Sequence, residues 1–212
     1  MARILSVNVG RPRGVRAGGR SVSTAIWKHP VEGSVAVRGV NLEGDDQADR
    51  TTHGGVDKAV YAYAIEDTGA WERELGRELG QAPFGENLTT EGLDVSGALV
   101  GERWCIGTAV LEVAQPRLPC FKLGLRLGDP SFPQLFVRAR RPGAYLRIVQ
   151  EGTLRAGDTI EVADRPAHGV SVRLVSDAIV GDRHLIPQVL DAPQLPEGLR
   201  EWLTHALARR SA

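Results

Sequence analysis

The stretch WCIGTAVLEVAQPRLPCFKL, residues 104–123, carries the strongest signal for the fold. Its first half holds two runs of β-favouring residues, WCI and TAVLEV, on either side of Gly107. Outward from it, similar runs recur between turns that contain glycine, proline or aspartate: RILSVNV, SVSTAI, SVAVRGV, KAVYAY, AYLRIV and DTIEV. Such spacing is typical of an antiparallel barrel or sandwich rather than of alternating βαβ units. We therefore predict a mainly β fold of the α+β class, with an antiparallel β-barrel at its core.

Helical patterns interrupt these runs and dominate the end of the chain. In EDTGAWERELGRELG (66–80), Trp71, Leu75 and Leu79 repeat at helical spacing among charged side chains. Towards the C-terminus, VSDAIVGDRHLIPQVL and PEGLREWLTHALARR also have helical patterns. We expect peripheral helices around a β-barrel domain over residues 1–165, and a short helical extension over residues 166–212 that packs on the barrel.

The composition is that of an ordinary folded protein and excludes several classes. Hydrophobic residues make up 42% and charged residues 25% of the chain, so disorder is not expected. No apolar run approaches the ~18–20 residues of a membrane span, and the N-terminus lacks the apolar stretch of a signal peptide. The net charge of zero gives no sign of a nucleic-acid partner. Two cysteines without an export signal indicate a cytoplasmic protein with no membrane partner.

The charges are unevenly distributed along the chain. Residues 41–102 hold 14 acidic and 4 basic side chains, whereas residues 115–150 hold seven basic side chains and Asp129 as the one acid. The basic region contains Cys120. Part of the excess belongs to ordinary solvated surface, and the rest could serve a small anionic ligand.

Cys120 lies in a segment that Pro116 and Pro119 make stiff, because each proline fixes its own φ and restricts the residue before it. In extended backbone Lys122 shares a face with Cys120, and a turn at the prolines could bring Arg117 round. Nearby cations favour the thiolate, which is the form that attacks electrophiles or binds metals. The alternative is a small buried hydrophobic residue. In this cationic setting we favour a functional sulfur.

Three further features complete the candidate chemistry. Cys105 alternates with Trp104 and Ile106 in an expected strand, so we predict that it packs in the core. In the HGG turn before KAVYAY, Gly54 and Gly55 could form an anion-binding nest, with His53 and Lys58 as added donors; an ordinary turn is the alternative.

The third feature is the FGEN turn, in which Gly85 precedes Glu86 and Asn87. Asn87 could orient a polar ligand, but on its own evidence an ordinary Asx-turn is favoured. The chain contains no CxxC, HExxH, Walker A or strand-linked GxGxxG motif, and two cysteines cannot supply four thiolates to an iron–sulfur cluster. These gaps leave no evident zinc, NTP or dinucleotide site.

In order and spacing, the segments LEGDDQADRTTHGGVDKAVYAY, PFGENLTTEGLD, GERWCIGTAVLEVAQPRLPCFKL and GTLRAGDTIEV resemble the MOSC domain family, named for the C-terminal region of molybdenum-cofactor sulfurases. The resemblance is to its stand-alone bacterial YiiM-like branch and covers about residues 1–165. It implies a β-barrel that binds the molybdenum cofactor (molybdopterin, Mo), with Cys120 as the catalytic metal ligand. The cofactor-binding residues would be His53, Gly54, Gly55, Lys58, Gly85, Glu86, Asn87, Arg117 and Lys122.

The resemblance also implies an activity. We expect a molybdenum-dependent oxidoreductase that reduces N-hydroxylated bases or related N–O compounds by oxygen-atom transfer to molybdenum. A separate flavin or iron–sulfur reductase would supply the electrons. The oligomeric state is left open, with a homodimer as one option. Two alternatives remain: a non-catalytic carrier or sensor of the cofactor or its sulfur, and a thiol hydrolase or transferase with Cys120 as nucleophile and His53 as base.

Overall fold

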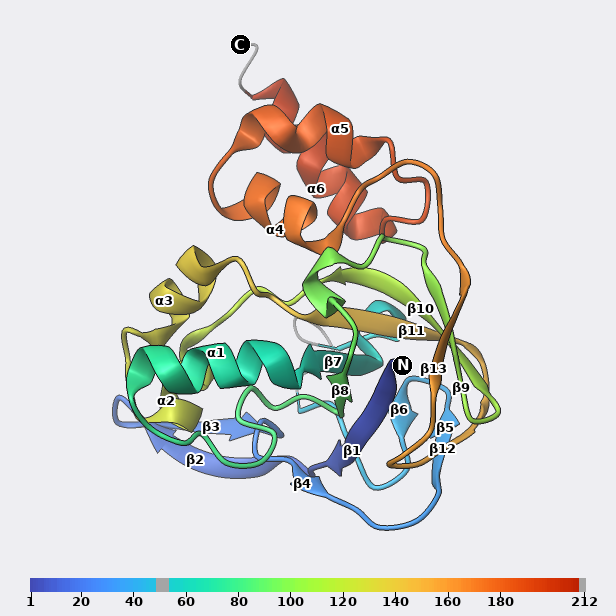
Figure 1. Ribbon diagram of the computed structural model, residues 1–212. Helices are drawn as coiled ribbons and strands as arrows, with labels where there is room; N and C mark the ends of the chain where they lie inside the picture. Colours follow the sequence, from blue (N-terminus) through green and yellow to red (C-terminus); the bar gives the residue numbers. More distant parts are fainter. Residues whose placement is uncertain (49–53, 210–212) are drawn as a thin grey trace.

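The computed structural model describes residues 1–48 and 54–209 and has a mixed sheet with helices on one side and at one end (Figure 1). Its largest sheet has eight strands in the order β13-β9-β10-β11-β7-β8-β1-β4. Their bounds are β13 Ile160–Asp164, β9 Arg103–Ile106, β10 Ala109–Pro116, β11 Ala144–Gln150, β7 Val60–Ala64, β8 Leu88–Glu91, β1 Arg3–Val9 and β4 His29–Pro30. A three-stranded sheet holds β12 (Gly152–Leu154), β5 (Val35–Arg38) and β6 (Asn41–Leu42), and β2 (Arg13–Ala17) pairs with β3 (Arg20–Thr24).

The hairpin β9–β10 forms where the sequence predicts it. Gly107 has a φ of 58° at the turn, and Leu111 pairs with Trp104 across the two strands. Both of these side chains are fully buried, as is Ile106. Cys105 lies between Trp104 and Ile106 and is only half-buried, so the prediction that it packs in the core is wrong. Alternation along a strand places it on the opposite face.

The strands β7 and β8 pair in parallel, so the prediction of a purely antiparallel sheet is wrong at this point. The chain between them contains helix α1 (Ile65–Leu75), and a helical crossover allows the second strand to run in the same direction as the first. The remaining pairs in the eight-stranded sheet are antiparallel. The molecule is therefore α+β with a mixed sheet and, within residues 1–48 and 54–209, six α-helices.

The predicted barrel is not confirmed, because no strand ladder among residues 1–48 and 54–209 closes the sheet. One isolated bridge, Arg3↔Thr159, links β1 to the residue before β13. Around it, Ile4 N donates to Asp158 O at 2.9 Å and Ile160 N donates to Ala2 O at 2.9 Å. In the described chain, β1, which is next to the end strand β4, therefore meets the start of β13 over a few residues.

Two apolar clusters hold the sheet and its helices together. One lies along the sheet strands and includes Val60, Trp104 and Leu111. The other is aromatic and packs α1, α2 (Phe121–Leu127) and α3 (Phe132–Ala139) beside β7, with Trp71 and Phe132 rings 4.9 Å apart. The second cluster supports the segment that carries Cys120.

The C-terminal helices α4 (Val172–Val180), α5 (Ile186–Leu190) and α6 (Glu197–Ala208) gather at one end of the molecule, at the top of Figure 1. They form their own apolar cluster, to which Val100 contributes from the sheet side. The helices are present as predicted, while the domain boundary near residue 165 stays a prediction. None of the described helices has the length and hydropathy needed to cross a membrane.

Candidate functional site

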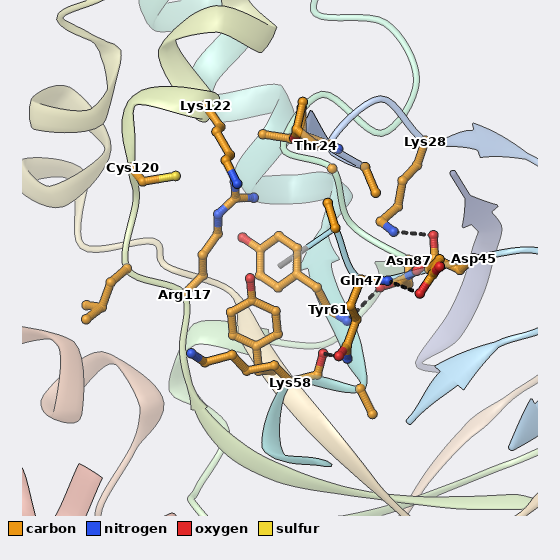
Figure 2. A pocket seen from close by; sticks show the side chains of 18 residues that line it. Thr24, Lys28, Asp45, Gln47, Lys58, Tyr61, Asn87, Arg117, Cys120 and Lys122 are labelled. Carbon is orange, nitrogen blue, oxygen red and sulfur yellow. Dashed lines mark hydrogen bonds and ion pairs between the residues drawn. The ribbon is translucent and has the colours of Figure 1, made fainter. Parts of the chain in front are cut away.

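A cavity opens beside the carboxyl end of β10, and Figure 2 shows the side chains that line it. It encloses about 730 Å³ of space, counting its open mouth. Its walls come from six separate segments of the chain, between residues 24 and 145. The lining residues are Thr24, Ala25, Ile26, Lys28, Asp45, Asp46, Gln47, Ala48, Lys58, Ala59, Tyr61, Gly85, Asn87, Arg117, Leu118, Cys120, Lys122 and Tyr145.

The thiol of Cys120 points into this cavity (Figure 2). Cys120 is the last residue before α2, and its φ of −126° and ψ of 175° are extended, as the flanking prolines favour. It is half-buried, and its carbonyl oxygen accepts a hydrogen bond of 2.9 Å from Leu123 N at the start of the helix. The sulfur is therefore held on a fixed backbone and faces open space.

Arg117 forms a cationic wall next to Cys120. Its side chain is buried, its Nη1 donates to the Phe84 carbonyl oxygen, and its guanidinium carbon lies 5.0 Å from the centre of the Tyr61 ring. Tyr145 completes this wall, with its ring 5.1 Å from that of Tyr61. Burial raises the pKa of both phenols, so they stay neutral hydrogen-bonding groups.

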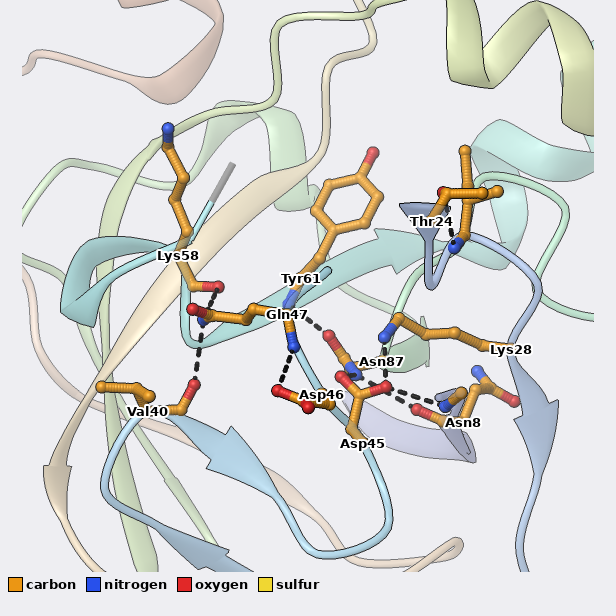
Figure 3. A network of polar contacts seen from close by, with 12 residues as sticks. Asn8, Thr24, Lys28, Val40, Asp45, Asp46, Gln47, Lys58, Tyr61 and Asn87 are labelled. Atoms are coloured by element: carbon orange, nitrogen blue, oxygen red, sulfur yellow. Dashed lines mark hydrogen bonds and ion pairs between the residues drawn. The ribbon is translucent and has the colours of Figure 1, made fainter. Parts of the chain in front are cut away.

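The opposite wall holds a buried ion pair that sequence reasoning did not find (Figure 3). Lys28 Nζ donates to Asp45 Oδ1, and both side chains are more than 90% buried. Gly10 N donates to the same oxygen at 2.8 Å, and Asn87 Nδ2 donates to Asp45 Oδ2 at 2.8 Å. These bonds tie the loop after β6 to the ends of three strands.

Burial lowers the pKa of Lys28, and the charge of Arg117 acts in the same direction. The carboxylate of Asp45 opposes both effects. A buried ammonium is costly unless it is paired, so Asp45 is the group that keeps a charge at this position. Lys28 is the one formally charged residue in SVSTAIWKHPV (21–31). This isolation among uncharged residues was the signal that could have identified it as a buried lysine.

The side chain of Asn87 connects several segments at the wall of the cavity through hydrogen bonds. Its Oδ1 accepts from Tyr61 N at 3.0 Å, and its Nδ2 also donates to Asn8 O at 3.2 Å. The Asx-turn favoured for Asn87 is therefore wrong, because its side chain bonds to distant strands. Asn87 lines the cavity and joins β7 to β1.

The neighbouring residues of the FGEN turn differ in position. Gly85 lines the cavity with a φ of 71°, and a Cβ there would lie 2.7 Å from Ile26 Cγ1, so glycine allows the close approach. Glu86 is fully buried and does not line the cavity. Phe84 N donates to its Oε2 at 3.1 Å and Thr89 Oγ1 to its Oε1 at 3.2 Å, while burial raises its pKa. Its position is that of a turn-stabilising group.

The HGG turn is only partly visible, since His53 lies outside the described residues. Gly55 has a φ of 98°, and its N–H donates to Gln47 Oε1 at 2.9 Å. Gln47 Nε2 in turn donates to the carbonyl oxygens of Lys58 at 3.2 Å and Val40 at 3.1 Å. Figure 3 shows this clamp. Gly54 and Gly55 do not line the cavity, whereas Lys58 does.

Six of the predicted site residues thus meet in one cavity, and their charges agree with an anionic ligand. They are Lys58, Gly85, Asn87, Arg117, Cys120 and Lys122. With Lys28 the described lining holds four basic side chains, against the carboxylates of Asp45 and Asp46. In the described part of the chain, no group of three or more His, Cys, Asp and Glu residues is arranged to hold a metal ion.

Comparison with known proteins places the chain among a set of related sequences. The MOSC domain model matches residues 49–161. The "Uncharacterized protein YflK" of Bacillus subtilis is 37% identical over 173 residues, which cover 82% of this chain and 78% of that protein. "Protein YiiM" of Escherichia coli is 36% identical over 145 residues, covering 67% of this chain and 65% of that protein.

Two further similarities bear on function and fold. A protein named "Reductase" from Gibberella moniliformis is 31% identical over 197 residues; the match covers 91% of this chain but only 35% of that protein. The crystal structure of YiiM from Geobacillus stearothermophilus superposes with a TM-score of 0.79 at 30% identity, covering 97% of this chain and 98% of that one.

Proposed function

Since the chain belongs to the MOSC domain family, we propose that it binds a molybdenum cofactor and reduces N-hydroxylated bases or related N–O compounds. The observation that carries the proposal is the thiol of Cys120, which points into a cavity with four basic side chains. A relative named as a reductase supports the redox class. The alternatives are a carrier of the cofactor and a thiol hydrolase.

The residues that line the cavity fit this cofactor. Cys120 would supply a soft thiolate ligand to molybdenum, whose remaining ligands would come with the pterin. Arg117, Lys122, Lys58 and Lys28 would balance the negative charge of the dithiolene and the phosphate. When bound, the cofactor supplies two-electron chemistry that removes oxygen from an N–OH group. A separate flavin or iron–sulfur reductase would replace the electrons.

The protein side of the reaction is the supply of protons and the exclusion of bulk water. Reduction of R–NH–OH to R–NH₂ consumes two electrons and two protons and releases water. Lys28 Nζ lines the cavity, and its lowered pKa makes it a better proton donor than an exposed lysine. Asp45 holds that ammonium in place. Tyr61 and Tyr145 close the adjoining wall with neutral rings.

Anaerobic purification followed by molybdenum and pterin analysis tests the cofactor, and reduction of 6-hydroxylaminopurine with a chemical electron donor tests the activity. Cys120→Ser should lose molybdenum and turnover. Cys105→Ser is the matched control, since that thiol is half-buried on β9, and it should keep both. Retained turnover in Cys120→Ser would exclude the ligand role.

The same preparation separates the alternatives. Bound molybdenum and pterin without turnover on any N-hydroxylated compound would favour the carrier. Protein without molybdenum, in which Cys120 is alkylated rapidly at neutral pH, would favour the hydrolase and overturn the proposal.

A further inference from the structure

A second hollow lies between the β2–β3 hairpin and α2, next to the cavity that contains Cys120. It has about 1120 Å³ of space, counting its open side, which is room for a small molecule. Its walls are mostly apolar, and Arg20 is the one ionisable residue among the described residues that line it. The lining residues are Ala17, Gly18, Arg20, Val22, Phe121, Gly124, Leu125, Gly128 and Pro130. We call this hollow the arm groove.

The arm groove and the cavity both lie along one face of β3. Alternate residues of a strand share a face, and Arg20 and Val22 line the groove while Thr24 lines the cavity. Their burial increases in the same order: Arg20 is exposed, Val22 half-buried and Thr24 buried. The opposite wall is α2, where Phe121 faces the groove and its neighbour Cys120 faces the cavity.

The hairpin itself carries charge of one sign. No Asp or Glu occurs among residues 1–31, which include Arg11, Arg13, Arg16 and Arg20. Within the described part of the chain, none of these four arginines forms an ion pair, although Arg13 lies over the Trp27 ring at 4.2 Å. Arg20, an exposed cation without an ion-pair partner among the described residues, lines the apolar groove, and this arrangement fits a ligand with an anionic group.

We propose that the arm groove binds an N-hydroxylated base in its phosphorylated, nucleotide form. This inference rests on the proposed function. The base lies between Val22 and Phe121, an aromatic residue that is 53% exposed and so open to stacking. Arg20 binds the phosphate, and the N–OH group points toward Cys120. The β3 stretch from Arg20 to Thr24 spans about 13 Å, a length of the order of a mononucleotide.

The hairpin provides a matched pair of variants. Ala17 pairs with Arg20 and Arg16 pairs with Ser21, so Arg20 is on the groove face and Arg16 on the opposite face. Arg20→Gln and Arg16→Gln therefore change the net charge equally, but only Arg20→Gln removes a cation from the groove.

Isothermal titration of the full-length protein with adenosine 5′-monophosphate and with adenine tests the site without turnover. The nucleotide should bind at least about 10-fold more tightly than adenine, and Arg20→Gln should remove most of that difference. Arg16→Gln should change neither affinity by more than about 2-fold. Phe121→Ala should weaken both ligands about 10-fold.

Three results would overturn the inference. One is equal affinity for adenosine 5′-monophosphate and adenine. Another is an equal effect of Arg16→Gln and Arg20→Gln. The last is slower reduction by an acidic electron-donor protein in Arg20→Gln with unchanged nucleotide affinity, which would assign the hairpin to protein docking. Because titration needs no molybdenum, failure of the proposed function leaves this test intact.

Discussion

The basic side chains of the cavity wall and those of the β2–β3 hairpin differ in burial and in pairing. In the cavity wall, Lys28 is buried and bonded to Asp45, which also accepts hydrogen bonds from Gly10 and Asn87. On the β2–β3 hairpin, Arg16 and Arg20 are exposed and form no ion pair with described residues. A buried charge is costly unless it is paired within the fold, whereas an exposed charge is solvated and remains free to bind a ligand. Lys28 therefore has its counter-charge within the fold, whereas Arg20 is available to the ligand that we propose for the arm groove.

The largest expected effect comes from the removal of the buried carboxylate. Asp45→Asn leaves the Lys28 ammonium without its counter-charge and should lower the free energy of unfolding by about 3–5 kcal/mol. Urea denaturation measures the loss. Because the Lys28 pKa then falls further, stability should recover as the pH rises, when the unfolded chain also releases its proton.

The double variant Lys28→Met with Asp45→Leu is the control. It removes both charges together and should cost less than Asp45→Asn alone. An equal or larger cost for the double variant would contradict the view that the charge of Lys28 depends on Asp45.

An effect of intermediate size is expected at Asp67, in the first turn of α1. Burial is the main cause that raises the pKa of this carboxyl group to about 6. The folded chain binds this proton more tightly than the unfolded chain, so stability falls as the pH rises from 3.8 to about 6. Asp67→Asn should remove that loss and raise the free energy of unfolding by about 1 kcal/mol at pH 7, allowing for partial exposure. Glu78→Gln, an exposed position beyond the end of α1, is the control and should change the free energy of unfolding by less than about 0.5 kcal/mol.

The smallest effect should come from the hairpin. Arg16→Gln and Arg20→Gln should each change the free energy of unfolding by less than about 0.5 kcal/mol, because both side chains are exposed and unpaired with described residues. Thermal denaturation measures it. A loss as large as that of Asp45→Asn would show that the hairpin arginines are structural, and the contrast between the two regions would disappear.

The sequence could predict the elements that local patterns determine. The β9–β10 hairpin follows from two β-favouring runs around Gly107, and α1 follows from the spacing of Trp71 and Leu75. Cys120 was placed in a stiff, cationic segment because its prolines and charges are neighbours in the chain. Local spacing carries this information directly.

The features that the sequence could not predict depend on contacts between distant segments of the chain. Lys28 and Asp45 meet only because the chain folds back; Lys28 stands out as an isolated charge in its segment, but nothing local identifies Asp45 as its partner. Glu86 was grouped with Asn87 as a ligand-binding residue, yet neighbours in an irregular turn point to different places, and only Asn87 reaches the cavity. The parallel pairing of β7 and β8 depended likewise on where α1 packs.

The bridge between Arg3 and Thr159 has a consequence for synthesis on the ribosome. The backbone of Ala2 and Ile4 finds its partners at residues 157–160, which are made about 155 residues later. At ~5–20 residues per second the nascent N-terminus waits on the order of 10 s with an unsatisfied strand edge. Such an edge can pair with another chain, so chaperone binding should concentrate on the first strand during translation.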